Sequence, residues 1–157
     1  MRSQMHHLDW ESMFRRYVFD SRKTPYTTPV AKLTKTQAGY ELYFYCLIVT
    51  VLLAGVSLMS ISPKLPHQGA LGVTACALLL TASTIALGLT KHPLAAATTA
   101  IAPAAGLAYV MIYGFHPQAG DTDKAVLVVV LGLWLLYNWR IVAIANAYRD
   151  MPEEPPA

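Results

Sequence analysis

The sequence predicts an all-α integral membrane protein, with four transmembrane helices preceded by a short cytoplasmic amphipathic helix. Of the 157 residues, 55% are hydrophobic and only 13% are charged, whereas an average soluble domain carries roughly 25% charged residues. The apolar residues gather in four runs, each near the length of about 20 residues that crosses a bilayer. Lys and Arg residues are concentrated on one set of connections between these runs, which predicts how the runs are oriented.

Residues 1–39 form a predicted cytoplasmic or interfacial arm, and residues 10–19 within it form a predicted amphipathic helix. The apolar members of this helix recur at the spacing of a single helical face: Trp10, Met13, Phe14, Tyr17 and Val18. Arg15 and Arg16 fall on the opposite side. Because a helix of about ten residues is only marginally stable in water, it needs a surface. That surface is either the membrane interface or the protein's own helix ends.

The transmembrane domain is expected over residues 40–150, followed by a cytoplasmic tail at residues 151–157. Its four spans are expected at residues 40–62, 70–90, 94–115 and 125–146. Short segments rich in Pro, Gly and polar residues separate these spans. The second and third spans are rich in Ala, Thr and Gly, which lets membrane helices approach closely, and Pro103 predicts a kink in the third.

The basic residues predict the orientation of the chain. Four spans place both termini on one side, and ten of the twelve Lys and Arg residues lie on that side when Lys91 in the "KHP" turn is included. Only Lys64 and Lys124 lie opposite. Since cytoplasmic connections carry the excess of Lys and Arg, both termini are expected in the cytoplasm and the protein in the inner, cytoplasmic membrane.

Arg140 interrupts the last apolar run. The fifteen residues from Ala125 to Trp139 cover about 22 Å of a hydrocarbon core that is about 30 Å thick. At that depth an arginine can extend its side chain to the headgroups, and the neighbouring Tyr137 and Trp139 resemble an interfacial aromatic belt. We therefore expect Arg140 to mark the membrane boundary without a fixed counter-charge; the alternative is a functional charge inside the bilayer. Glu41, at the start of the first span, suits a helix N-terminus.

The sequence contains no phosphate loop, dinucleotide fingerprint, zinc-ligand spacing or nucleophile elbow, and its histidines all fall outside the predicted spans. Four residues expected on the outer side could together bind a metal ion: His67, His116, Asp121 and Asp123. Solvated loop residues are the simpler interpretation of this set. No cofactor is predicted, and bound lipid is expected.

These observations favour a non-catalytic accessory subunit or adaptor of a larger inner-membrane complex, without enzymatic activity. The expected partners are a bilayer with an anionic inner leaflet and other integral membrane subunits, and not nucleic acid. The expected docking or interface surface combines the arm helix, including Arg15 and Arg16, with Tyr137, Trp139 and Arg140. One alternative is a small oligomeric transporter or channel built around the Thr-rich second and third helices. Another is a membrane enzyme or cofactor-binding subunit that uses the outer histidines and aspartates.

Overall fold

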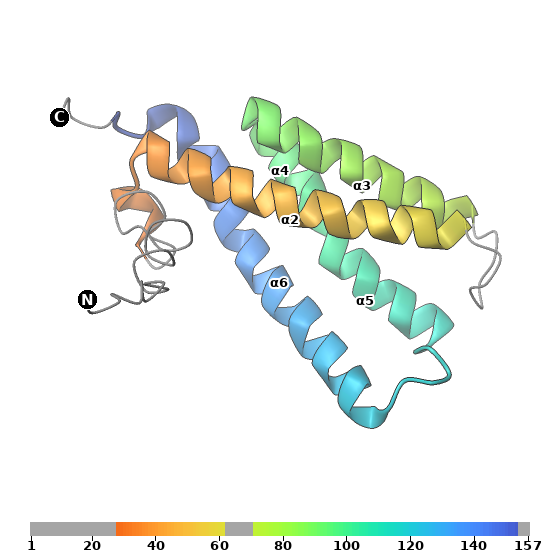
Figure 1. The fold of residues 1–157 in the computed structure, drawn as a ribbon. Coiled ribbons are helices and arrows are strands. Elements are labelled where there is room, and N and C mark those ends of the chain that lie inside the picture. The colour runs from red at the N-terminus through yellow and green to blue at the C-terminus, as the bar shows by residue number, and fades with distance from the viewer. Residues whose placement is uncertain (1–27, 62–70, 154–157) are drawn as a thin grey trace, which may run out of the picture.

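A computed structural model describes residues 28–61 and 71–153; the predicted arm helix and His67 lie outside this part of the chain. Within the described residues every regular element is helical (Figure 1): η1 Val30–Lys32, α2 Lys35–Ile61, α3 Leu71–Thr90, α4 Pro93–Thr99, α5 Ile101–Tyr113, α6 Asp121–Ala147 and η2 Tyr148–Asp150. Four helices, counting α4 and α5 together, are long and apolar enough to cross a membrane. Length and composition thus fit a multi-pass membrane protein.

The first span is capped at its start and fastened to the end of the last span. Thr34 and Gln37 form the reciprocal bonds of a capping box, with N–O distances of 3.1 and 3.3 Å, which satisfy two free backbone donors of α2. The next amide, that of Lys35, donates to the carbonyl of Pro152 at 2.9 Å. We call the end of the bundle where α2 begins and α6 ends the proximal end, and the opposite end the distal end.

The second span lies alongside the first over most of its length (Figure 1). Gly88 faces Cys46 so closely that a Cβ atom at Gly88 would lie 3.4 Å from the Cβ of Cys46. Toward the distal end, the hydroxyls of Ser60 and Thr74 are 2.8 Å apart and hydrogen bonded. Small residues permit this close approach, and the hydroxyl pair adds a hydrogen bond across the contact.

The third span is broken at Ala100, which separates α4 from α5. The distortion expected at Pro103 therefore lies three residues earlier. A proline has no backbone N–H and its ring collides with the carbonyl of the residue four positions before it, which here is Thr99. The regular helix is consequently interrupted at Ala100, whose amide still donates to the carbonyl of Ala96 at 2.9 Å, and α5 follows from Ile101 with Pro103 in its first turn.

The last span packs on its neighbours mainly through its second half. α6 meets α2 at the proximal end and diverges from it toward the distal end (Figure 1). Leu131 fills the space at Gly106, where a Cβ would lie 3.1 Å from its nearest methyl group. Before that contact, residues 126–130 are all at least 40% exposed. Five successive residues point to every side of a helix, so no other described element covers α6 there.

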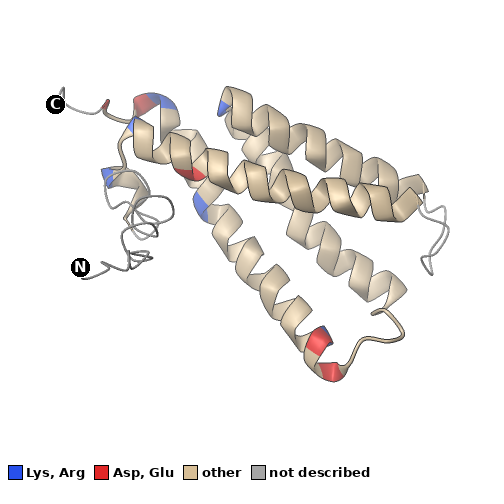
Figure 2. Cartoon of the chain, viewed as in Figure 1, with Lys and Arg blue, Asp and Glu red and all other residues tan. Residues whose placement is uncertain are grey.

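Charged residues lie at the two ends of the bundle (Figure 2). Three charged residues stand at the start of α6, at the distal end: the exposed Asp121 and Asp123, and the half-buried Lys124. The described basic residues of the proximal end are Lys32, Lys35, Lys91, Arg140 and Arg149. This arrangement agrees with the charge asymmetry that the sequence predicts between the two sides of the spans.

Candidate functional site

A buried ion pair joins the first and last spans near the proximal end. Glu41 of α2 is 1% exposed, and the side chain of Arg140 on α6 is 20% exposed. Nε of Arg140 donates to Oε1 of Glu41 at 2.6 Å, and Nη2 donates to Oε2 at 3.0 Å. Two parallel charge-assisted bonds between a planar guanidinium and a carboxylate fix both distance and orientation.

Two further bonds extend this pair. The hydroxyl of Tyr137 donates to Oε1 of Glu41 at 2.9 Å. Nη1 of Arg140 donates to the backbone carbonyl of Thr28 at 2.8 Å. The guanidinium thus connects three parts of the chain: α2, α6 and the segment that precedes η1.

Helical spacing explains why these side chains meet. On α6, Tyr137 and Arg140 are three residues apart, so both project from one face. On α2, Glu41 and Tyr45 are four apart and share a face in the same way. The rings of Tyr45 and Tyr137 approach with centroids 6.1 Å apart and planes tilted by 46°, a favourable arrangement for aromatic pairs. The contact between α2 and α6 is therefore aromatic next to its charged part.

A second cluster lies one turn deeper and includes the broken third span. The Tyr45 hydroxyl donates to Oδ1 of Asn138 at 2.5 Å and accepts from Nε1 of Trp134 at 3.3 Å. Nδ2 of Asn138 donates to the carbonyl of Ala100 at 3.2 Å, at the break between α4 and α5. We call the two clusters together the proximal polar network, which consists of Glu41, Tyr45, Trp134, Tyr137, Asn138 and Arg140.

The expectation that Arg140 has no fixed counter-charge is wrong. Its partner lies 99 residues away in the sequence, on another span, and α6 itself supplies no acid near it. The helix-terminus role expected for Glu41 is also not observed, because α2 begins at Lys35 and its first turn contains no acidic residue. The available signal was that Glu41 is the only carboxylate in the first apolar run.

The other predicted interface residues lie apart from these contacts. Trp139, beside Arg140, is 83% exposed on the surface of α6, where its belt role stays a prediction. The predicted arm residues lie outside the described part of the chain: Trp10, Met13, Phe14, Arg15, Arg16, Tyr17 and Val18. Tyr137 differs from Trp139 and from the arm residues, because its hydroxyl is hydrogen bonded to Glu41 inside the bundle.

The residues of the predicted metal site are engaged in local contacts. Nδ1 of His116 accepts from the amide of Gln118 at 3.2 Å, and Asp121 pairs with Lys124 at 2.9 Å. Asp123 accepts from the amide of Gly120 at 3.0 Å and so caps the start of α6. Residues 28–61 and 71–153 contain no group of three or more His, Cys, Asp or Glu side chains that could hold a metal ion. A site that also uses His67 stays a prediction.

Ionisable groups inside a membrane usually mark function, so the proximal polar network is the leading candidate site. Both carboxylate oxygens and all three guanidinium nitrogens of its ion pair have hydrogen-bond partners within the protein. Among the described residues that are not exposed, no fully buried side-chain nitrogen or oxygen lacks a hydrogen-bond partner.

The fold and the site define a small helical protein with four helices long and apolar enough to span a membrane, the first and last of which are joined near one end by a buried ion pair. Comparisons of the chain with protein families, with curated proteins and with solved structures found no significant match.

Proposed function

We propose that this protein is a non-catalytic structural subunit or adaptor of a larger assembly of membrane helices. One observation carries the proposal: over residues 126–130 the last span is exposed on every side. Membrane helices associate by packing and by interhelical hydrogen bonds. A span held firmly at one end and uncovered at the other offers a partner helix a long apolar surface.

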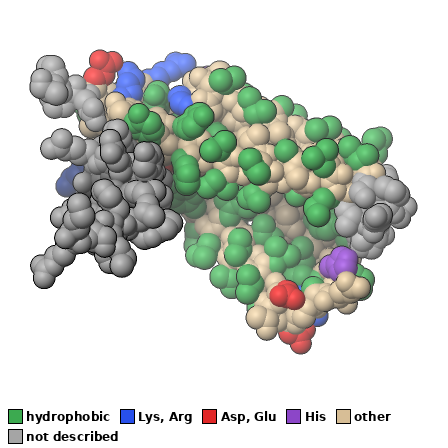
Figure 3. All heavy atoms as spheres, in the orientation of Figure 1, with side chains coloured by type: hydrophobic (Ala, Val, Ile, Leu, Met, Phe, Trp, Pro, Cys, Tyr) green, Lys and Arg blue, Asp and Glu red, His purple; other side chains and the backbone are tan. Residues whose placement is uncertain are grey.

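The surface around residues 126–130 is also apolar and exposed. Hydrophobic side chains spread across the face on which α2 and α6 diverge (Figure 3). On α2, Leu47, Val51 and Leu58 are each more than half exposed, and on α6 Leu133 and Leu136 are exposed by 61 and 72%. Either lipid or the helices of a partner protein can cover this apolar face. The face continues into the uncovered residues 126–130 of α6, which supports the helices of a partner.

The proximal polar network supports a structural role for the clamped end. A bidentate ion pair with additional donors restricts how α2 and α6 can move relative to each other. A rigid proximal end would hold η1 and η2 in fixed relative positions. We propose that this end faces the cytoplasm in the inner membrane, because basic residues gather there and favour an anionic leaflet.

Photo-crosslinking in native membranes tests the proposal. A photoreactive amino acid at Val129, which is 58% exposed, should give a discrete crosslink to another integral membrane protein. The matched control is Leu131, which is 8% exposed and faces Gly106, so it should crosslink only within the chain. Lipid adducts alone at Val129, together with a chain that purifies without partners in mild detergent, would contradict the subunit proposal.

A small transporter or channel is the second candidate, and one observation favours it. Hydroxyls from two spans meet between α3 and α4, with Thr99 about 3.5 Å from both Ser83 and Thr84. Such a cluster could line a narrow polar path. In that case the purified protein in liposomes should conduct a solute, and Thr84→Val should reduce the flux. Absence of flux across a panel of ions and small solutes would favour the subunit proposal.

A further inference from the structure

Two side chains of α2 that contact α6 begin a longer regular row. Glu41 and Tyr45 bond to α6 within the proximal polar network. Alternating steps of four and three residues keep side chains on one face of a helix, and these steps continue the row from Tyr45 to Ile48 and Leu52. We call these four residues the α2 seam. Its two distal members are aliphatic, so the polar contacts of this face end at Tyr45.

A matching row runs along α6. Arg140 and Tyr137, the two residues of α6 that bond to Glu41, are its proximal members. Counting back by four and then by three residues leads to Leu133 and Val130, which lie on the same face of the helix. We call these four residues of α6 the α6 seam. Like the α2 seam, it is polar near the proximal end and aliphatic beyond it.

The contacts at the proximal end fix which members of the two seams are opposite each other. α2 runs from the proximal to the distal end, and α6 runs in the reverse direction (Figure 1). Seven residues forward on α2 therefore correspond to seven residues back on α6, starting from the ion pair and from the ring contact of the two tyrosines. The opposite positions, from the proximal end, are Glu41 and Arg140, Tyr45 and Tyr137, Ile48 and Leu133, and Leu52 and Val130. Each aliphatic member of one seam thus has an aliphatic counterpart on the other.

The aliphatic counterparts are not packed against each other in the structure. α6 diverges from α2 toward the distal end (Figure 1), and hydrophobic side chains are uncovered on this face (Figure 3). The four aliphatic members of the seams are between 44 and 61% exposed, whereas Glu41 and Tyr45 are buried. Two rows that are in register at one end and apolar beyond it are therefore in contact over only part of their length.

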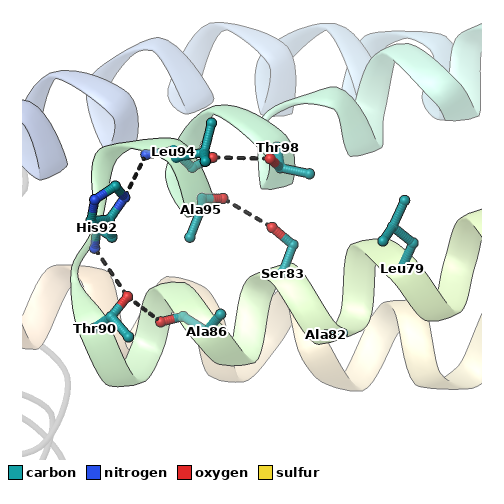
Figure 4. A pocket seen from close by; sticks show the side chains of 9 residues that line it. All are labelled: Leu79, Ala82, Ser83, Ala86, Thr90, His92, Leu94, Ala95 and Thr98. Carbon is teal, nitrogen blue, oxygen red and sulfur yellow. Dashed lines mark hydrogen bonds between the residues drawn. The ribbon is translucent and has the colours of Figure 1, made fainter.

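The third span allows α5 and α6 to move together relative to the other helices. Figure 4 shows the bond that holds α4 on α3, from the hydroxyl of Ser83 to the carbonyl of Ala95 at 3.2 Å. α5 instead packs on α6, where a leucine of α6 fills the space at Gly106. The two parts of the span meet at Ala100, whose carbonyl accepts from Asn138 of α6. Hinges commonly lie at such ends of helices, and here the bond ties the hinge to α6.

We propose that α5 and α6 swing together about this hinge and about the ion pair, so that the α6 seam closes onto the α2 seam. The ion pair and the tyrosine contact lie at the pivot and stay in place. Packing of the aliphatic members adds van der Waals contacts, which stabilise the association of membrane helices. Closure covers one side of α6 only. Val128 and Val129 lie on other sides of the helix and stay open to a partner, so the closed form does not depend on the proposed subunit function.

Disulfide crosslinking of the full-length protein in native membranes tests the register of the seams. Cys46 and Cys76 are first replaced by alanine. Leu52→Cys combined with Val130→Cys should then form a disulfide within one chain on mild oxidation, because closure brings the two positions within reach of a disulfide. The matched control is Leu52→Cys with Val128→Cys, which places the second thiol on nearly the opposite side of α6 and should react about tenfold more slowly. Equal rates for the two pairs, no disulfide in either pair, or disulfides that join two chains would overturn the proposal.

Spin labels in liposomes test the movement itself. Val51 and Val129 are exposed and lie outside both seams, so labels there leave the seams free. Pulsed electron paramagnetic resonance should show two distances between the labels, the longer from the observed arrangement and the shorter from the closed form. Leu52→Trp overfills the seam and should remove the shorter distance, whereas Leu58→Trp, on the exposed side of α2 outside the seam, should keep it. A single distance, or a shorter distance that persists in Leu52→Trp, would overturn the proposal.

Discussion

Replacing Arg140 with lysine tests the clamp between the first and last spans. In the native protein the guanidinium makes three hydrogen bonds, two to Glu41 and one to the carbonyl of Thr28. A lysine keeps the positive charge but presents a single ammonium group, which cannot reproduce a planar two-point contact. Arg140→Lys should therefore weaken the fold although it conserves charge. A freely extending boundary arginine would tolerate the same change.

The expected decrease in the free energy of unfolding follows from the contacts that Arg140→Lys removes. An ammonium at this position can keep one bond to the Glu41 carboxylate and loses the second, together with the bond to Thr28. Hydrogen bonds to charged groups contribute about 1.5–3 kcal/mol in soluble proteins, and interhelical bonds in membranes contribute less, on average about 0.6 kcal/mol. We expect Arg140→Lys to lower the free energy of unfolding by about 2 kcal/mol, between these bounds. Arg140→Ala leaves a buried carboxylate without its cation and should cost about 3–5 kcal/mol.

Unfolding by sodium dodecyl sulfate in mixed micelles, followed by circular dichroism, measures these differences. Arg149→Lys is the matched control, since Arg149 is exposed at the same proximal end; it should change the stability by less than about 0.5 kcal/mol. If Arg140→Lys and Arg149→Lys unfolded at the same detergent fraction, the bidentate contact would contribute nothing and the reasoning would be refuted.

Three further results are expected. Asn138→Leu removes the acceptor of the Tyr45 hydroxyl and the donor to Ala100, and should cost about 1 kcal/mol in the same assay; no loss would remove Asn138 from the network. Gly88→Leu should separate α3 from α2 at Cys46 and destabilise the fold, whereas Gly55→Leu, with open space around its Cβ position, should be tolerated; equal effects would contradict the observed packing. Single cysteines can be introduced into a cysteine-free variant of the protein and expressed in intact cells. Membrane-impermeant thiol reagents should then label only the cysteines on the outer side. The sites expected to react are Gln68 and Thr122, and the sites expected to stay unlabelled are Ser21 and Glu154. Labelling at Ser21 would refute the proposed orientation.

The number of long apolar helices can be predicted from hydropathy and from the Pro, Gly and polar segments between them, because a membrane span leaves a strong local signal in the sequence. The interruption of the third span was also partly predictable from Pro103. The irregularity lies at Ala100, in the turn before Pro103, because the ring of a proline collides with the carbonyl four positions earlier.

The ion pair could not be predicted, because it depends on which faces of two distant spans meet. Sequence spacing places Tyr137 and Arg140 on one face of a helix and Glu41 and Tyr45 on one face of another. It does not say that the first and last spans cross at those faces. The sequence offers a local explanation for a single arginine near the end of one apolar run. It offers another for a single glutamate near the start of a second run. Both explanations fail only once the structure shows that the two side chains form an ion pair.

The pairing of Arg140 also shows how a structural charge can be separated from a functional one. Removing one member of a buried pair leaves an uncompensated charge, whereas replacing both by apolar residues of similar volume is often neutral. Glu41→Leu combined with Arg140→Met should therefore recover most of the stability that Arg140→Ala loses, although the Tyr137 hydroxyl and the Thr28 carbonyl still lose their bonds. If the network only supports the fold, the double variant should also keep the crosslink from Val129. A stable double variant that no longer forms this crosslink would show that the charges themselves serve the partner, and the supporting role assigned to the network would fail.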